Sequence, residues 1–117
     1  MAEQGGGLSA EDAKLVTLAR ATRARVRAAE GAACRDRDGR TYAAATVDLP
    51  SLQLSAVAVC VAMAVASGSR GLEAAVVLTE EDAVAAEDLA ILADFGGPGV
   101  VVHRGDPAGR SVETVTA

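Results

Sequence analysis

The sequence predicts an α/β protein of three layers: a five-stranded mixed sheet with an N-terminal helix, a buried central helix and a third helix. The patterns alternate along the chain in the order helix, strand, strand, helix, strand, helix, strand, strand. Leu54–Ala66 is the longest apolar run, and Pro50 and Gly68 bracket it. A sheet covered by helices is the layer arrangement that buries both kinds of element.

The composition indicates one globular domain. We place it at residues 9–117, after a flexible N-terminus at residues 1–8. Half of the 117 residues are hydrophobic and 23% are charged, as in globular proteins. The formal net charge of −5 argues against a general nucleic-acid or anionic-membrane binder. An aromatic content of 2% also argues against base-stacking platforms.

Several features predict a cytoplasmic protein. The first seven residues are acidic and glycine-rich, unlike a targeting signal. The apolar run of about thirteen residues is too short to cross a bilayer. Cys34 and Cys60 both lie in apolar surroundings, which favours buried free thiols over a disulfide. Arginine far outnumbers lysine, which suggests a GC-rich genome such as an actinobacterial one.

The first predicted helix spans about Ala10–Val26, opened by a weak capping box of Ser9 and Asp12. Its apolar stripe faces inward, and arginines occupy another face. We interpret that face as a solvated helix surface, and an RNA- or phosphate-binding face is the alternative. Arg20, Arg23 and Arg27 lie on this face, and the RNA-binding alternative also uses Arg25.

A β-hairpin follows, with strands at residues 31–35 and 41–47. The Asp38-Gly39 pair is a strong hairpin signal, because such a turn requires positive φ. We expect the charged residues of the turn, Asp36 to Arg40, to be exposed to solvent.

The central run is ambiguous by periodicity, because valines and Met63 alternate with smaller residues as they would in a strand. Its length exceeds an ordinary strand. Pro50 in a first turn and Gly68 at the exit are helix punctuation. We therefore predict a buried helix over Pro50–Ser67.

The remaining elements complete the sheet and its cover. Leu72–Leu78 is predicted as a core strand. Thr79 and Asp82 suggest a capping box for a helix that runs to about Phe95. Strands are predicted at residues 99–103 and 111–115, on either side of a turn cluster at 105–109.

This order, together with several short motifs, resembles the cytidine deaminase family over almost the whole stretch from Leu15 to His103. A Gly-Ala-Ala strand is present at 31–33, and an Asp-Gly-Arg-x-Tyr turn at 38–42. An Asn-Val-Glu-like segment lies at 46–48, and an Ala-Val-Val strand at 75–77. The resemblance implies the deaminase fold and, in the family, a zinc-bound water with a glutamate that carries the proton.

The residues implied for that chemistry are missing from this chain. The family's Cys-Ala-Glu falls on Val57-Ala58-Val59, and its Pro-Cys-x-x-Cys falls on residues 84–88, with Ala85 and Asp88 at the ligand positions. Valine and alanine cannot bind a metal, and one carboxylate is not a zinc site. We therefore predict no catalytic residue, no metal ligand and no cofactor.

Two further sets of residues are candidates for binding. Thr46 and Asp48 stand where the family's ribose-binding Asn and Glu would be, and they are the predicted substrate-binding residues. Cys34, Cys60 and His103 are candidates for a relocated metal site. They lack ligand-pair spacing, and we expect His103 to be exposed at a strand end.

The resulting functional hypothesis is a deaminase-like protein that has lost catalysis. It would act as a binding or structural module in a homodimer or homotetramer, and a nucleoside is its candidate ligand. Nucleic-acid and membrane partners are not expected. The alternatives are an active cytidine deaminase that converts cytidine to uridine, and an RNA-associated module that uses the N-terminal arginines.

Overall fold

The computed structural model describes residues 8–117, so almost all of the predicted flexible N-terminus at 1–8 lies outside the described residues. The chain forms three α-helices, a five-stranded sheet and a separate two-stranded hairpin. The elements are α1 (Ala10–Val26), β1 (Gly31–Asp36), β2 (Thr41–Ala45), β3 (Val47–Leu49), β4 (Leu52–Leu54), α2 (Ala56–Ala66), β5 (Leu72–Leu78), α3 (Ala86–Gly96), β6 (Val101–Gly105) and β7 (Ser111–Thr116).

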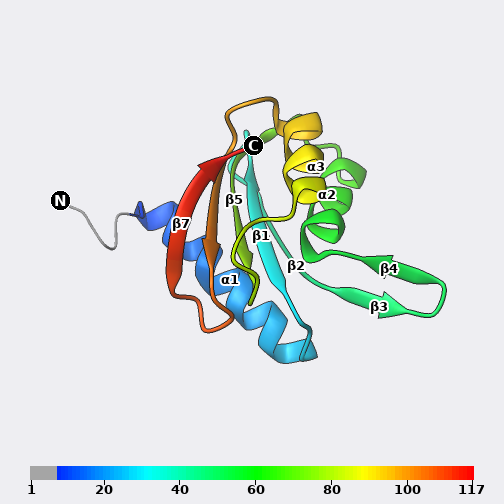
Figure 1. Cartoon of the computed structure of the whole chain (residues 1–117). Coiled ribbons are helices and arrows are strands. Elements are labelled where there is room, and N and C mark those ends of the chain that lie inside the picture. The colour runs from blue at the N-terminus through cyan, green and yellow to red at the C-terminus, as the bar shows by residue number, and fades with distance from the viewer. Residues whose placement is uncertain (1–7) are drawn as a thin grey trace.

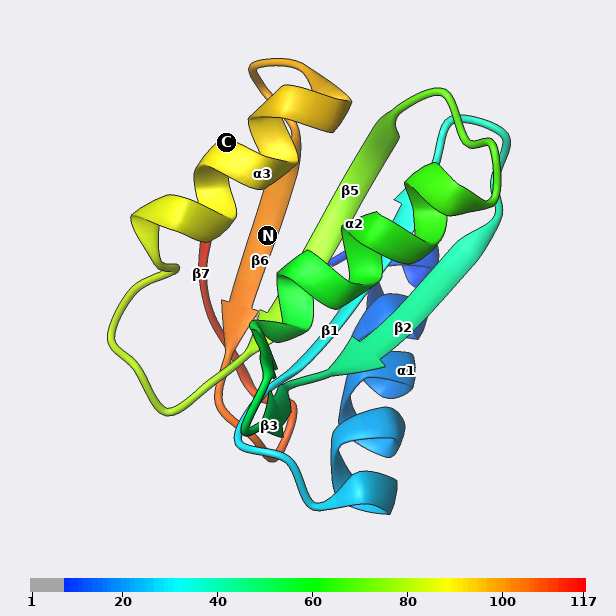
Figure 2. The same ribbon diagram turned by 90° about the vertical axis from the view of Figure 1, so that its right-hand side faces the viewer.

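The five-stranded mixed sheet is confirmed, with strand order β2-β1-β5-β6-β7. Only β5 and β6 are parallel, and every other neighbouring pair is antiparallel. Helix α1 covers one face, and α2 and α3 cover the other (Figures 1 and 2). None of the helices at residues 8–117 is long and apolar enough to cross a membrane.

Each face of the sheet has its own hydrophobic cluster. Leu15 and Ala19 of α1 pack on alternate residues of β1 and β5. The larger cluster lies beneath α2 and α3 and includes Val57, Cys60 and Leu92. With one Phe and one Tyr in the chain, both cores consist mainly of Val, Ala and Leu, as predicted.

The first helix and the first hairpin match their local signals. Helix α1 begins after Ser9, whose Oγ accepts a hydrogen bond from the Asp12 N–H at 3.1 Å. Gly39 has φ of +87° in the β1–β2 turn, the left-handed conformation that its position requires.

The prediction that all charged residues of this turn are solvated is wrong for Asp36, which is fully buried. Its carboxylate accepts hydrogen bonds from the backbone N–H groups of Asp38 and Arg40. It also accepts from the hydroxyls of Ser69 and Tyr42. Asp36 therefore ties the hairpin turn to the segment that leads from α2 into β5.

Both later helices begin after their predicted starts. Residues 47–54 form the β3–β4 hairpin, in which Pro50 lies in the turn, and α2 begins after its N-cap Ser55. The Thr79–Asp82 capping box is also wrong, because residues 80–85 are irregular and Ala85 precedes α3. The hydroxyl of Thr79 instead accepts from the Glu81 N–H at 3.1 Å.

Helix α2 is the predicted buried central helix, and within a single chain it is buried on its inner side. Ala56, Val57, Cys60, Val61 and Ala64 face the core. The outer residues Ala62, Met63, Val65 and Ala66 are exposed. No charged residue occurs from Ser55 to Gly68, so this exposed stripe is wholly apolar apart from the helix ends.

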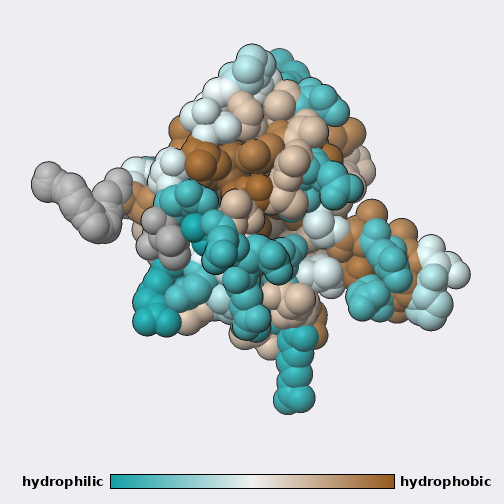
Figure 3. All heavy atoms as spheres, in the orientation of Figure 1, coloured by the Kyte–Doolittle hydropathy of each residue, from teal (hydrophilic) through white to brown (hydrophobic). Residues whose placement is uncertain are grey.

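The β3–β4 hairpin projects from the body of the molecule (Figure 1). Leu49 pairs with Leu52, and Val47 pairs with Leu54, so one face of the ribbon carries four aliphatic side chains. Leu49 and Leu52 are about half exposed, at 55% and 47%. Figure 3 shows hydrophobic atoms on this projecting element.

Candidate functional site

The N-terminal ends of α2 and α3 are joined by a hydroxyl–carboxylate pair. Ser55 caps α2, because its Oγ accepts from the Ala58 N–H at 3.0 Å. The same hydroxyl donates to Oδ1 of Asp88, in the first turn of α3, at 2.7 Å. Asp88 is only 5% exposed, and both helix ends direct positive partial charge toward this region.

A cavity of about 360 Å³ lies between these two helix ends. Its lining includes the carboxylates of Glu30, Glu87 and Asp88 and the amide of Gln53, with no basic residue. The carboxylate of Glu30 is held in place by the Thr79 hydroxyl, which donates to Oε2 at 2.9 Å. The remaining lining residues are Leu54, Ser55, Ala58, Ala85 and Ile91.

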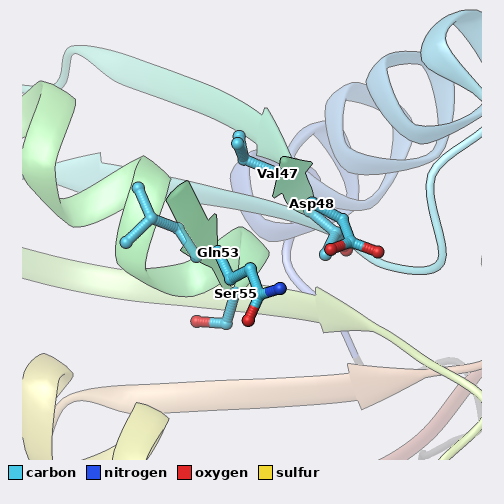
Figure 4. A pocket seen from close by; sticks show the side chains of 6 residues that line it. Val47, Asp48, Gln53 and Ser55 are labelled. Carbon is cyan, nitrogen blue, oxygen red and sulfur yellow. The ribbon is translucent and has the colours of Figure 1, made fainter. Parts of the chain in front are cut away.

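A second, more open hollow of about 350 Å³ lies beside the first, and the two share Gln53, Leu54 and Ser55 (Figure 4). The two predicted ribose-binding residues, Thr46 and Asp48, line this hollow. Asp48 and Gln53 are cross-strand partners in the β3–β4 hairpin, so their polar groups lie on one face of the ribbon.

Thr46 and Asp48 differ in how their polar groups are used. The Thr46 hydroxyl accepts from the Glu30 N–H at 2.9 Å and lies 3.3 Å from the Glu30 carbonyl oxygen, to which it donates. Thr46 lies between β2 and β3, and these two hydrogen bonds link it to the last residue of the α1–β1 loop. Asp48 is exposed on β3, so its carboxylate can accept hydrogen bonds from a ligand.

The residues at the family's zinc positions do not fit a zinc ion. Val57 is 2% exposed and packs in the core, and Val59 packs against the same cluster. Ala85 lies in the wall of the cavity. The side chains of Val57, Val59 and Ala85 are hydrocarbons, and Oδ1 of Asp88 accepts a hydrogen bond from Ser55. Among residues 8–117, no group of three or more His, Cys, Asp or Glu could hold a metal ion.

The three candidates for a relocated metal site do not form one cluster, because His103 lies on the other face of the sheet from the two cysteines. Cys34 and Cys60 are buried free thiols, as predicted, and they touch each other beneath α2. His103 bonds to Asp12 of α1, on the opposite face of the sheet.

The prediction of an exposed His103 is wrong, because the residue is 6% exposed. Its Nε2 lies 2.8 Å from Oδ2 of Asp12, and its Nδ1 lies 2.8 Å from the Thr114 hydroxyl. Asp12 also accepts from Arg35 at 3.0 Å. Burial opposes ionisation of Asp12, but the bonds from His103 and Arg35 outweigh it, so the pKa of Asp12 is lowered.

The arginines of α1 lie apart from both hollows. Arg20, Arg25 and Arg27 are exposed, whereas Arg23 is half-buried over β1. Arg27 ends the helix in the left-handed conformation, with φ of 55°. The interpretation of this surface as a solvated helix face, with RNA binding as the alternative, stays a prediction.

Sequence reasoning missed Glu30, Gln53, Ser55 and Glu87 as lining residues of the cavity. One signal was present for Ser55, because a serine directly before an apolar run is a common helix N-cap. Glu30 and Gln53 had none, because the fold brings them to the helix ends from separate elements.

We expect Ser55→Ala to lower the free energy of unfolding by about 1–2 kcal/mol. The change removes the N-cap of α2 and takes a hydrogen bond from the buried carboxylate of Asp88. Urea unfolding at neutral pH measures the difference. Ser51→Ala, in the exposed β3–β4 turn, is the control and should stay within about 0.5 kcal/mol of the wild type. Equal stability of the two variants would contradict the assigned role of Ser55.

The fold and the helix-end cavity define a class of protein: a three-layer α/β/α domain whose cavity lies at the N-terminal ends of two helices on one face of a mixed sheet. More particularly, the chain belongs to the cytidine deaminase-like family, whose profile matches residues 8–109.

Solved structures of cytidine deaminases share this fold. The enzyme from Burkholderia pseudomallei is 21% identical with a TM-score of 0.78, and the match covers 93% of each chain. The enzyme from Mycobacterium leprae is 22% identical with a TM-score of 0.71, covering 93% of this chain and 94% of that one. The Mycobacterium tuberculosis enzyme is 22% identical with a TM-score of 0.68, covering 88% and 89%. No curated protein sequence matches the chain.

Proposed function

We propose that this cytidine deaminase-like protein carries out no zinc-dependent deamination and acts as a binding and structural module of a homo-oligomer. One observation carries the proposal: Val57, Val59 and Ala85 occupy three of the four positions at which the family's ligands and proton-carrying glutamate are expected. Hydrolytic deamination needs an activated water and a group that transfers a proton, and hydrocarbon side chains supply neither.

The two adjoining hollows support a role in binding a small molecule. The second hollow, which Thr46 and Asp48 line, has a volume of about 350 Å³ and falls in the size range of small-molecule sites. Asp48, Gln53 and Ser55 give it a carboxylate, an amide and a hydroxyl. A carboxylate next to an amide suits a ligand with neighbouring hydroxyl groups, such as the ribose of a nucleoside.

The exposed apolar surfaces support self-association. The outer stripe of α2 lacks charge, and the hairpin presents Leu49 and Leu52 to solvent. Contiguous apolar surface of this kind is typical of association sites. In a two-fold assembly both copies use the same patch. A second copy of the chain can therefore bury the exposed apolar surface of the first.

We expect cytidine and uridine to shift backbone amide signals near Asp48 in heteronuclear NMR titrations. Over hours, the signals of cytidine should not be replaced by those of uridine. Asp48→Ala should weaken nucleoside binding by about tenfold, the effect of losing one charge-assisted hydrogen bond of about 1.5 kcal/mol. Asp94→Ala removes a carboxylate from the exposed side of α3 and is the matched control.

Two outcomes would contradict this assignment. Appearance of uridine signals at a rate proportional to protein concentration would show an active deaminase. Absence of any shift with every pyrimidine nucleoside would remove the nucleoside as the ligand.

A further inference from the structure

Two buried thiols touch each other in the core beneath α2. Cys34 in β1 and Cys60 in α2 are 1% and 2% exposed, and their sulfur atoms lie 3.4 Å apart. The Cys60 sulfur also lies 3.3 Å from the carbonyl oxygen of Tyr42, so its S–H has two acceptors within reach. The pair connects the sheet to the helix whose first turn forms one wall of the cavity.

We propose that Cys34 and Cys60 form a dithiol that a small two-electron oxidant of the peroxide class converts into an internal disulfide, fastening α2 to β1. With hydrogen peroxide, two S–H bonds and the O–O bond break, and one S–S bond and two water molecules form. Both sulfurs are oxidised and both peroxide oxygens are reduced, so no further reactant is needed.

The geometry requires only a small movement. A disulfide has an S–S distance of about 2.05 Å, so the sulfurs need to approach by roughly 1.3 Å from their present 3.4 Å. Ala32 of β1 and Ala75 of β5 pack in the same cluster as the two cysteines, and their short side chains border a space too narrow for a water molecule. Rotation of the two side chains with a slight shift of α2 can therefore bring the sulfurs together.

Burial determines which reagents can reach the pair and how quickly. Both thiols are covered by the core, so a bulky reagent needs unfolding, whereas peroxide needs only brief local opening. The contact with Cys34, together with burial, raises the pKa of the Cys60 thiol and keeps it protonated. We therefore expect oxidation to be slow in the closed protein and faster as temperature increases the opening of α2.

Intact-mass spectrometry of the native wild-type protein treated with hydrogen peroxide tests the proposal. The expected product is lighter by about 2 Da, the mass of two hydrogens, and dithiothreitol restores the original mass. Digestion should give one linked pair of peptides containing Cys34 and Cys60. The bond closes a loop across a sequence separation of 26, so the oxidised protein should melt about 10 °C higher.

Cys34→Ser and Cys60→Ser are the matched controls, and neither should show the 2 Da loss. The wild-type measurement needs no variant to fold. Two results would overturn the proposal. One is oxygen addition to either cysteine without linked peptides. The other is unchanged native protein at temperatures just below melting, under conditions in which the urea-unfolded chain reacts.

Discussion

Asp36→Ala is expected to lower the free energy of unfolding by about 3–5 kcal/mol, the largest loss for any single substitution considered in this chain. Asp36 is fully buried, and its carboxylate accepts four hydrogen bonds, two from backbone N–H groups and two from hydroxyls. Alanine leaves the two backbone N–H groups without this acceptor, and it leaves the hydroxyls of Ser69 and Tyr42, 2.7 Å apart, only each other, which costs more than the net value of the bonds.

Urea unfolding at pH 7 measures this loss. Asp38→Ala is the matched control, because Asp38 lies in the same turn and pairs with Arg70 at an exposed site. Its expected effect is within about 0.5 kcal/mol. Comparable effects of the two substitutions would mean that Asp36 does not anchor the hairpin turn.

The same carboxylate predicts sensitivity to acid. Burial alone would raise the pKa of Asp36, but the bonds from Ser69, Tyr42 and two backbone N–H groups outweigh it and lower the pKa below 3.8. Because the folded pKa is lower than the unfolded one, the stabilisation is complete above about pH 4 and is lost as pH falls through the folded value. Asp36→Ala should therefore flatten the stability profile below pH 4.

Ala62→Glu is expected to convert the proposed homo-oligomer into a monomer. Ala62 lies at the centre of the exposed apolar stripe of α2, so a glutamate is solvated in the monomer but buried without a partner in the assembly. A penalty of about 3 kcal/mol weakens association by roughly 100-fold. Sedimentation equilibrium should give a multiple of 11.7 kDa for the wild type and 11.7 kDa for the variant.

Ala90→Glu makes the same change on an exposed position of α3 and should leave the assembly intact. Circular dichroism confirms that both variants are folded. A wild-type protein that sediments as a monomer would remove self-association from the proposal. An oligomer unchanged by Ala62→Glu would place the contact on another surface.

The elements predicted correctly are those whose signals are local. Ser9 and Asp12 lie three residues apart, and Asp38-Gly39 forms its turn within one hairpin, so the sequence contains the whole interaction. Strand β5 and the two C-terminal strands are short segments rich in valine, with turn residues between the last two. The resemblance to deaminases implied the fold as a whole, which periodicity alone does not determine.

Two of the errors share a physical cause, since each depends on a partner distant in the sequence. Asp36 is buried because Ser69, 33 residues later, donates to it. His103 is buried because Asp12, 91 residues earlier, meets it across the sheet face. Pro50 is acceptable both in a first helical turn and in a hairpin turn, and pairing of Val47 with Leu54 decides for the hairpin.

The candidate site was predicted in part for the same reason. The resemblance identified positions 57, 59, 85 and 88, and Ala85 and Asp88 do line the helix-end cavity. Ser55, Asp88 and Glu30 lie on three separate segments of the chain. The fold brings them together at the cavity, where Ser55 bonds to Asp88. Residues of that kind are found only once the fold is known.

We propose that the helix-end cavity lacks the donors that zinc requires. Metal analysis of the purified protein by inductively coupled plasma mass spectrometry, after incubation with zinc and removal of unbound ion, tests it most directly. We predict well under 0.1 zinc per chain, because Asp88 is the one donor among the four family positions and no group of three or more His, Cys, Asp or Glu among residues 8–117 could hold a metal ion. One zinc per chain retained after gel filtration would contradict the claim and restore the reading of the chain as an active deaminase.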